Sequence, residues 1–177
     1  YLYARHDFHD AFMPREEALQ KASAAISTAL RNNPQETNAL LASVIIDTAA
    51  GNFSSAQTTL DGVLGRQPNH ATALYIYSEL ELARNRFDAA LSRAQQAYEL
   101  DPLSPWINVN LAIVHFWRSE YQPALEAVQN AIRIDNNYTW AYVWQAKIFH
   151  RQGQLSAAIT SMLQSADIDS ASVVNSA

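Results

Sequence analysis

The sequence contains no cysteine among its 177 residues. This absence excludes disulfide bridges, zinc sites built on thiolates and a cysteine nucleophile. Charged residues are also scarce, at 16% of the chain, and lysine and arginine form no cluster that could follow a phosphate backbone. With a formal net charge of −5 as well, we expect this segment to make no contact with nucleic acid.

Glycine and long apolar runs are equally rare. The four glycines (51, 62, 65 and 153) form no phosphate-binding pattern. The longest apolar stretch, LLASVIIDTAA, is interrupted by Asp47 and is too short to cross a bilayer, so we expect no membrane insertion by this segment. The sequence has neither a nucleophile elbow nor a helical HExxH motif. We therefore predict that the chain is not an enzyme and uses no cofactor.

Histidines provide the only candidate metal ligands. The segment HDFHD (6–10) places His6 and His9 three residues apart, a spacing that can hold a metal ion on a helix. No third ligand is evident, so we predict no metal site. His115 lies among apolar residues, and we predict that it is buried and hydrogen-bonded.

What the sequence does contain is an internal repeat with a fixed period. Alanine recurs at this period, and an aromatic residue or leucine precedes each alanine by three positions. Proline keeps the same period three times, and Asn136 takes the fourth place. The columns are Ala22, Ala56, Ala90, Ala124 and Ala158; Leu19, Phe53, Phe87, Tyr121 and Leu155; and Pro34, Pro68 and Pro102. A period of about 34 residues is typical of stacked helical repeats.

Each unit is predicted to contain two helices and two turns. In 105–138, PWINVNLAIVHFWR is the first helix and QPALEAVQNAIRI the second. The turns within units carry Gly51-Asn52, Asn85-Arg86, Ser119-Glu120 and Gly153-Gln154, where glycine and asparagine tolerate a left-handed backbone. Pro34, Pro68 and Pro102 stop the second helices of the first three units, because proline lacks an amide donor and restricts the residue before it.

A unit of this kind cannot bury its apolar face alone, so neighbouring units must stack. We predict a single all-α domain over 1–177, built from about five units: 3–36, 37–70, 71–104, 105–138 and 139–172. The first unit is irregular, with the longer turn AFMPREE. The start at Tyr1 and the end in SASVVNSA lead us to expect a segment of a longer protein.

This repeat resembles the tetratricopeptide repeat, and the resemblance covers nearly the whole chain. It is strongest at ALYIYSELELARNRFDAALSRAQQAYELDP and NVNLAIVHFWRSEYQPALEAVQNAIRID. The resemblance implies a right-handed superhelical solenoid that exposes its first helices on a concave inner face. A narrower stretch, 98–148, looks like the repeat domains of bacterial winged-helix regulators of the CadC/ToxR type. That likeness would make the chain the sensory half of a transcriptional regulator.

The inner face would hold any binding site. Residues three or four apart on a helix share a face, and the predicted stripes are rich in aromatic side chains, which are enriched at binding hot spots. We predict that Trp106 and Trp140 face the groove and that Trp117 and Trp144 pack between helices. The predicted partner-binding residues are Tyr75, Glu79, Trp106, Val109, Ile113, Phe116, Trp140, Val143, Lys147 and His150. Asn38, Leu41, Ile45, Thr48 and Leu82 complete the stripes.

Several functions remain open at this point. The first is a sensory or interaction domain of a bacterial regulator that binds a protein or peptide. The alternative is a stand-alone adaptor or assembly scaffold, co-chaperone-like or related to secretion. A small-molecule site inside the superhelix, or self-association as a homodimer, would also use an apolar inner face. The compartment stays open too: bacterial cytoplasm, or periplasm if a transmembrane segment precedes this one.

Overall fold

The computed structural model describes residues 15–174, with side chains from 17 to 169, and over this range the chain is all helical, without strands. This confirms the predicted all-α fold. The segment HDFHD and the first helix expected in unit 3–36 lie outside the described residues. The helices are α1 (Arg15–Asn32), α2 (Thr37–Ala49), α3 (Phe53–Arg66), α4 (Ala71–Ala83), α5 (Phe87–Leu100), α6 (Pro105–Trp117), α7 (Tyr121–Ile134), α8 (Thr139–Arg151) and α9 (Leu155–Val174).

Helix ends fall where the proline column predicts them. α1, α3 and α5 each end two residues before Pro34, Pro68 or Pro102, and α7 ends two residues before Asn136. At α2, α4 and α6 the next helix is then started by a side chain that accepts a backbone N–H, whereas α8 has no such cap. His70 Nδ1 accepts from Ala73, and Ser104 Oγ accepts from Ile107, directly ahead of Pro105 in the first turn of α6.

The turns inside the units share one backbone conformation. Gly51, Asn85, Ser119 and Gly153, which occupy equivalent positions in successive units, have φ values of 80°, 57°, 63° and 75°. A left-handed residue ends a helix and lets the chain reverse into an antiparallel neighbour. Glycine adopts this conformation without strain, whereas serine adopts it at a steric cost.

Exchanging residues at this turn position is expected to change stability in opposite directions. Gly51→Ala should lower the free energy of unfolding by about 1 kcal/mol. A Cβ atom at Gly51 meets nothing within 4 Å, so backbone strain alone would act. Ser119→Gly relieves the same strain and should be neutral or stabilising by up to about 1 kcal/mol. Urea unfolding followed by circular dichroism measures both; a stabilising Gly51→Ala would contradict this account.

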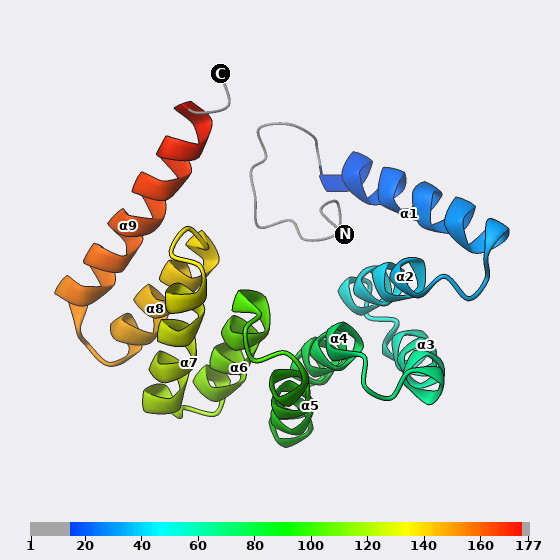
Figure 1. The fold of residues 1–177 in the computed structure, drawn as a ribbon, viewed down its shortest axis with the longest axis horizontal. Coiled ribbons are helices and arrows are strands. Elements are labelled where there is room, and N and C mark those ends of the chain that lie inside the picture. The colour runs from blue at the N-terminus through cyan, green and yellow to red at the C-terminus, as the bar shows by residue number, and fades with distance from the viewer. Residues whose placement is uncertain (1–14, 175–177) are drawn as a thin grey trace.

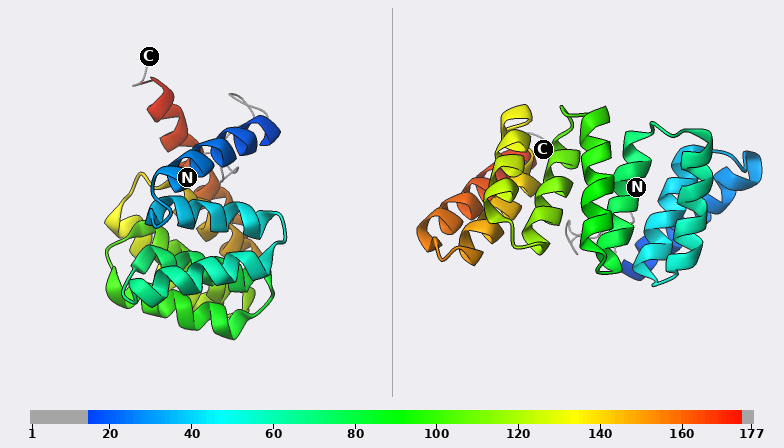
Figure 2. Two further views of the ribbon diagram at one scale, coloured as in Figure 1. Left: turned by 90° about the vertical axis from the view of Figure 1, so that its right-hand side faces the viewer. Right: turned by 90° about the horizontal axis from the view of Figure 1, so that it is seen from below.

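The helix pairs stack into an arch that runs from α1 to α9 (Figure 1). Consecutive helices pack on each other throughout. Across units, α2 contacts α4, α4 contacts α6 and α6 contacts α8, whereas α3, α5, α7 and α9 make no contact with one another. Because first helices contact one another across units and second helices do not, the first helices lie on the short, inner side of the curve. Two further views show the row of pairs and its superhelical twist (Figure 2).

The core lies between the helices of neighbouring pairs. All five alanines of the repeating column are buried, at 8% exposed or less. A small side chain at this position lets the second helix approach the first closely, as predicted. Ile107 on α6 is fully buried in the cluster formed mainly by α2 to α5, with Trp106 packed against it, while Val109 and the apolar residues after it pack in clusters with α5, α7 and α8. It therefore joins the two halves of the solenoid.

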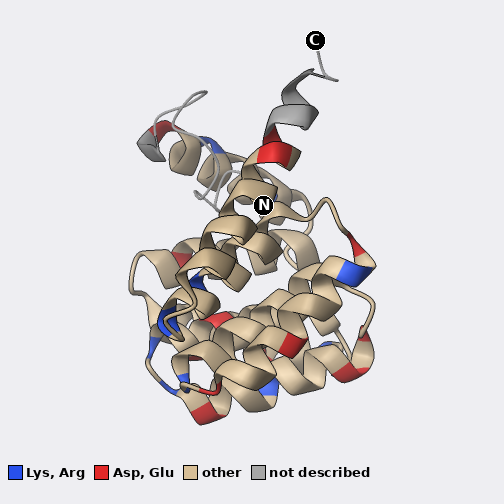
Figure 3. Ribbon diagram, turned by 90° about the vertical axis from the view of Figure 1, so that its left-hand side faces the viewer, with Lys and Arg blue, Asp and Glu red and all other residues tan. Residues whose placement is uncertain are grey.

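Charges are sparse and mixed on the described helices. Figure 3 shows acidic and basic residues interspersed along ribbons that are mostly uncharged. In the part of the chain that the structure describes, no helix combines the length and apolar character needed to span a bilayer.

Candidate functional site

Four positions of each first helix lie on one line along the inner face. The second, third and fourth positions follow the first by four, seven and eleven residues, and at 3.6 residues per turn these steps place all four side chains on nearly the same side of the helix. The pocket and ring contacts below involve these positions. They are Asn38, Ala42, Ile45 and Ala49 on α2; Thr72, Ile76, Glu79 and Ala83 on α4; Trp106, Asn110, Ile113 and Trp117 on α6; and Trp140, Trp144, Lys147 and Arg151 on α8.

An apolar pocket of about 370 Å³ opens at the α2 end of this face. Side chains from three successive first helices line it: Asn38, Leu41, Ala42, Thr72, Ile76 and Trp106. The room arises because Ala42 and Thr72 are small where α6 and α8 carry larger side chains. Trp106 forms one wall. A pocket with these dimensions and lining would take one or two aliphatic side chains of a partner.

The same Trp106 also borders a second, closed depression between α4, α6 and α8, which has no room for a water-sized group in this conformation. Its lining is Tyr75, Glu79, Trp106, Val109, Asn110, Ile113, Tyr138 and Trp140. The rings of Tyr75 and Trp106 meet edge to face, with centroids 5.0 Å apart. Tyr75 Oη donates a hydrogen bond of 2.9 Å to Glu79 Oε1. These contacts hold the Trp106 ring in place between the pocket and the depression.

The polar side chain of Asn110 also lines this depression. Asn110 is 1% exposed, and among the described residues neither its Nδ2 nor its Oδ1 has a hydrogen-bond partner. Leaving a buried amide unsatisfied costs about 1–3 kcal/mol. A carboxamide offers one donor and one acceptor side by side, the pair that a peptide backbone unit complements.

At the α8 end, the face is aromatic and basic. Trp144 lies edge to face with Trp140 and with Phe116, at centroid distances of 6.3 and 5.5 Å. Lys147 Nζ lies 4.2 Å from the centre of the Trp144 ring, and the Arg151 guanidinium lies 5.7 Å from the centre of the Phe116 ring. Cation–π contacts hold the two cations against the face.

The inner face therefore has a direction. The acidic residue Glu79 lies on α4, in the middle of the inner face, and the basic residues Lys147 and Arg151 lie on α8, at its end. The α2 and α6 lines contribute no charged residue. An extended partner would be oriented by these charges and anchored by the apolar pocket.

The structure places the predicted partner-binding residues at different depths. Tyr75 and Val109 are 1% exposed and form the floor between adjacent first helices, and Phe116 is buried at 9%. Glu79, Trp106, Ile113, Trp140 and Val143 are half-buried, and Lys147 and His150 are exposed. Six of these ten line the depression: Tyr75, Glu79, Trp106, Val109, Ile113 and Trp140. Their role in binding remains a prediction.

Sequence reasoning missed part of the face. Ala42, Thr72, Ile76 and Asn110 line the pocket or the depression, and Trp144 belongs to the aromatic end. The signal was available in the spacing: steps of three residues led to Val109, Phe116, Val143 and His150, whereas steps of four would have led to Asn110 and Trp144.

One tryptophan prediction was right and one was wrong. Trp144 is packed, at 8% exposed, whereas Trp117 is 51% exposed. Trp117 is the last residue of α6, and its ring meets that of Phe116 edge to face at a centroid distance of 5.6 Å. Trp117 also borders a surface hollow with the start of α5, lined by Asn85, Arg86, Phe87, Asp88, Ala89 and Arg118.

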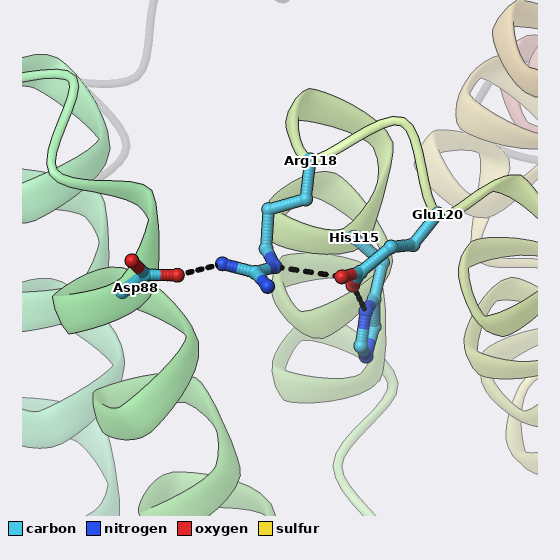
Figure 4. Close-up of polar contacts among 4 residues, drawn as sticks. All are labelled: Asp88, His115, Arg118 and Glu120. Carbon is cyan, nitrogen blue, oxygen red and sulfur yellow. Dashed lines mark hydrogen bonds and ion pairs between the residues drawn. The ribbon is translucent and has the colours of Figure 1, made fainter.

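A chain of polar contacts beside Trp117 ties the third unit to the fourth (Figure 4). Arg118 bonds to Asp88 at the start of α5 and donates from Nε to Glu120 Oε1 at 3.0 Å. Glu120 Oε2 lies 2.7 Å from His115 Nδ1. Hydrogen bonds from Arg118 and then His115 lower the pKa of the Glu120 carboxyl. His115 is thus mostly buried and hydrogen-bonded, as predicted.

Metal ligands do not gather elsewhere in the described part of the chain. Over that part, no group of three histidine, aspartate or glutamate side chains is close enough to hold a metal ion. The candidate segment HDFHD lies outside it.

Comparisons with known proteins agree with the repeat. The family model described as tetratricopeptide repeat matches residues 48–105 and 80–139. No curated protein sequence matches the chain.

Solved structures share the fold at low sequence identity. TTC0263, a thermophilic protein of Thermus thermophilus, is 18% identical with a TM-score of 0.77, covering 86% of each chain. PilW, a widely conserved type IV pilus biogenesis factor, is 20% identical with a TM-score of 0.74, covering 88% of this chain and 72% of PilW. MamA from Desulfovibrio magneticus RS-1 is 19% identical with a TM-score of 0.66, covering 88% and 86%. At this sequence identity the similarity shows the fold alone.

Proposed function

This chain belongs to the tetratricopeptide repeat family, and we propose from that premise that it is a non-catalytic scaffold that binds an extended segment of another protein on its inner face. Stacked repeats of this kind present extended concave surfaces for binding. Its role would be to hold a partner within a larger assembly. The single observation that carries the proposal is the unsatisfied carboxamide of Asn110 beside Trp106 and the apolar pocket.

The pocket would supply the anchor. An aliphatic side chain of the partner would enter between α2 and α4, against Ile76 and the ring of Trp106. Burying one leucine or isoleucine side chain contributes about 1.5–3 kcal/mol. Trp106 is held by Tyr75, so little side-chain entropy would be lost on binding.

Asn110 would read the partner's backbone. Binding that opens the small space beside Trp106 would let Nδ2 donate to a peptide carbonyl and Oδ1 accept from a peptide N–H, which satisfies both groups at once. Lys147 and Arg151 would favour acidic residues in the part of the partner that reaches α8. The expected ligand is thus an extended peptide with an aliphatic residue followed or preceded by acidic ones.

Selection from a random dodecapeptide library displayed on phage would test this proposal. The bait is the full chain, and Leu103→Ala serves as a control bait, because Leu103 is 74% exposed in the turn before α6 and lines neither the pocket nor the depression. We expect selected peptides with an aliphatic residue and an acidic residue, binding wild type and Leu103→Ala alike. Failure to enrich any sequence, or enrichment only of peptides that lack the aliphatic anchor, would contradict the proposal.

Replacing Asn110 by leucine is expected to separate stability from binding. Removing the unsatisfied amide should raise the free energy of unfolding by about 1 kcal/mol. The same change should weaken binding of a selected peptide about 10-fold, because its backbone loses two hydrogen bonds. Urea unfolding and isothermal titration calorimetry measure the two effects. A variant that is more stable and binds equally well would show that Asn110 does not contact the peptide.

The choice between scaffold and regulator rests on different observations. PilW has the same fold at 20% identity and serves in pilus biogenesis, and we propose by analogy a role in assembling a protein complex. The regulator role rests on the resemblance of residues 98–148 alone. The neighbouring sequence would distinguish them, since a regulator requires a winged helix in the same polypeptide.

A further inference from the structure

The basic residues of the inner face are confined to one helix. Lys147 and Arg151 are the only lysine or arginine residues on the four described first helices α2, α4, α6 and α8, and both lie on α8. Both side chains are exposed. Neither forms an ion pair with a described carboxylate, unlike Arg118, which is paired with Asp88 and Glu120. The two cations of the inner face are therefore available to a carboxylate of a partner.

Aromatic rings hold these two cations against the face. Lys147 Nζ lies 4.2 Å from the centre of the Trp144 ring and 5.3 Å from that of the Trp140 ring. The Arg151 guanidinium lies 5.7 Å from the centre of the Phe116 ring. A ring beside a cation excludes water from that side, which strengthens the attraction of the cation for a carboxylate. A side chain that is already held also loses less entropy on binding. The α8 end is thus prepared for an acidic residue.

The apolar pocket lies across the inner face from these cations. It opens between α2 and α4 and has Trp106 of α6 as a wall. In the described structure first helices contact each other in succession, α2 with α4, α4 with α6 and α6 with α8, and α2 does not reach α6. The axes of packed helices are about 8–10 Å apart. The pocket and α8 are therefore separated by two to three such spacings, roughly 20–25 Å.

We propose that the inner face selects its partner by the separation of two residues, an aliphatic residue and an acidic residue that stand about seven positions apart in an extended segment. This inference rests on the proposed function and adds the spacing to it. An extended chain advances about 3.3 Å per residue, so a span of roughly 20–25 Å takes about six to eight residues. The aliphatic side chain enters the pocket, and the carboxylate reaches Lys147 and Arg151.

Asn110 lies within this span and favours an extended partner. It is on α6, between the helices that line the pocket and α8. Its carboxamide has no partner among the described residues and requires backbone groups that are not already paired. A helix pairs its own backbone groups and advances only about 1.5 Å per residue, so it would need about fifteen residues to cover the same span. An extended segment satisfies the pocket, Asn110 and the cations with about half that length.

Selection from two dodecapeptide libraries displayed on phage, with the full chain as bait, tests the spacing. One library fixes leucine at the third position and the other fixes it at the tenth, and every other position is random. We expect aspartate or glutamate to be enriched at about positions 9–11 of the first library or about positions 2–4 of the second, because both lie about seven residues from the leucine. The library that yields such peptides also shows in which direction the partner crosses the face.

A bait that carries Lys147→Glu and Arg151→Glu makes the test specific. Both residues are exposed, so its helix content by circular dichroism should match wild type. This bait should enrich lysine or arginine at the positions where wild type enriches acids, and it should bind a peptide selected on wild type at least about 10-fold more weakly. Arg66→Glu with Arg133→Glu is the matched control, because it changes the net charge equally at exposed residues of the second helices α3 and α7. The control should select the same peptides as wild type.

Three results would overturn the spacing. Peptides that bind without a preferred position for the acid would do so while leaving peptide binding intact, as would acids enriched within about four residues of the leucine. The same selection by wild type and by the bait with reversed charges at α8 would remove Lys147 and Arg151 from the site. Failure of every bait to enrich any sequence would overturn the proposed function together with this inference.

Discussion

Replacing both Trp106 and Trp140 by alanine is expected to weaken binding of a selected peptide by at least about 100-fold, because buried aromatic anchors at interfaces contribute about 2 kcal/mol or more each. Trp106 forms a wall of the apolar pocket and borders the depression, and Trp140 borders the depression on its other side. Both substitutions remove surface that the partner would cover. Isothermal titration calorimetry measures the loss.

The fold should survive this double change. Both rings are half-buried and lie on the inner face, so the far-ultraviolet circular dichroism spectrum should stay the same. Trp117→Ala is the matched control, since Trp117, although it ends the α6 line, is 51% exposed and lines neither the pocket nor the depression. Its effect should be under about threefold, a typical value for a residue outside the hot spot. An equal loss in Trp117→Ala would move the binding site to the edge of the solenoid.

Ile107→Ala is expected to lower the free energy of unfolding by about 2–5 kcal/mol, the usual range for truncating a buried isoleucine. Ile107 is fully buried and belongs to the cluster of α2 to α5 although it lies on α6. Stacked units contact only their neighbours. The substitution should therefore weaken the junction between the two halves and separate their unfolding into two steps.

The distribution of tryptophan makes this separation measurable. All four tryptophans, Trp106, Trp117, Trp140 and Trp144, lie on α6 and α8. Tryptophan fluorescence thus reports mainly on the second half, with Trp106 at the junction, whereas far-ultraviolet circular dichroism reports on all helices. In urea the two curves should coincide for wild type and diverge for Ile107→Ala. Ile159→Ala, at an isoleucine that is 62% exposed, should change stability by under about 0.5 kcal/mol. Coincident curves for Ile107→Ala would contradict the two-step account.

Much of the fold could be predicted because its determinants are local or strictly periodic. Pro34, Pro68 and Pro102 stop helices whatever surrounds them. Gly51 and Gly153 permit the left-handed turn for the same kind of reason. The alanine column repeats because every pair of helices must approach equally closely. Three columns of one period therefore determined the helices, their order and their stacking.

The inner face was less predictable. The step from Trp106 to Val109 and the step to Asn110 differ by about 100° around the helix, yet both are compatible with one amphipathic pattern. Whether a residue lies at the bottom of the groove or on its side depends on how deeply it is buried. Burial of Val109 depends in turn on the side chains that α4 and α8 bring against α6. These neighbours lie one full repeat away along the chain on either side. The same holds for Asn110, whose unsatisfied amide becomes evident only when every possible partner has been placed.

The amino-acid sequence by itself determined the repeating pair of helices, the limits of most helices and the grouping of aromatic residues on first helices, since short-range backbone chemistry and a periodic pattern are sufficient for these features. Only the tertiary structure decided that Trp117 is exposed, that Asn110 faces the groove without a partner and that α9 exposes apolar side chains. Exposure is a property of the surroundings of a side chain, and in a solenoid those surroundings come from adjacent units. Met162, for example, is 51% exposed on α9, although the equivalent Leu60, Ala94 and Val128 in the preceding units are fully buried.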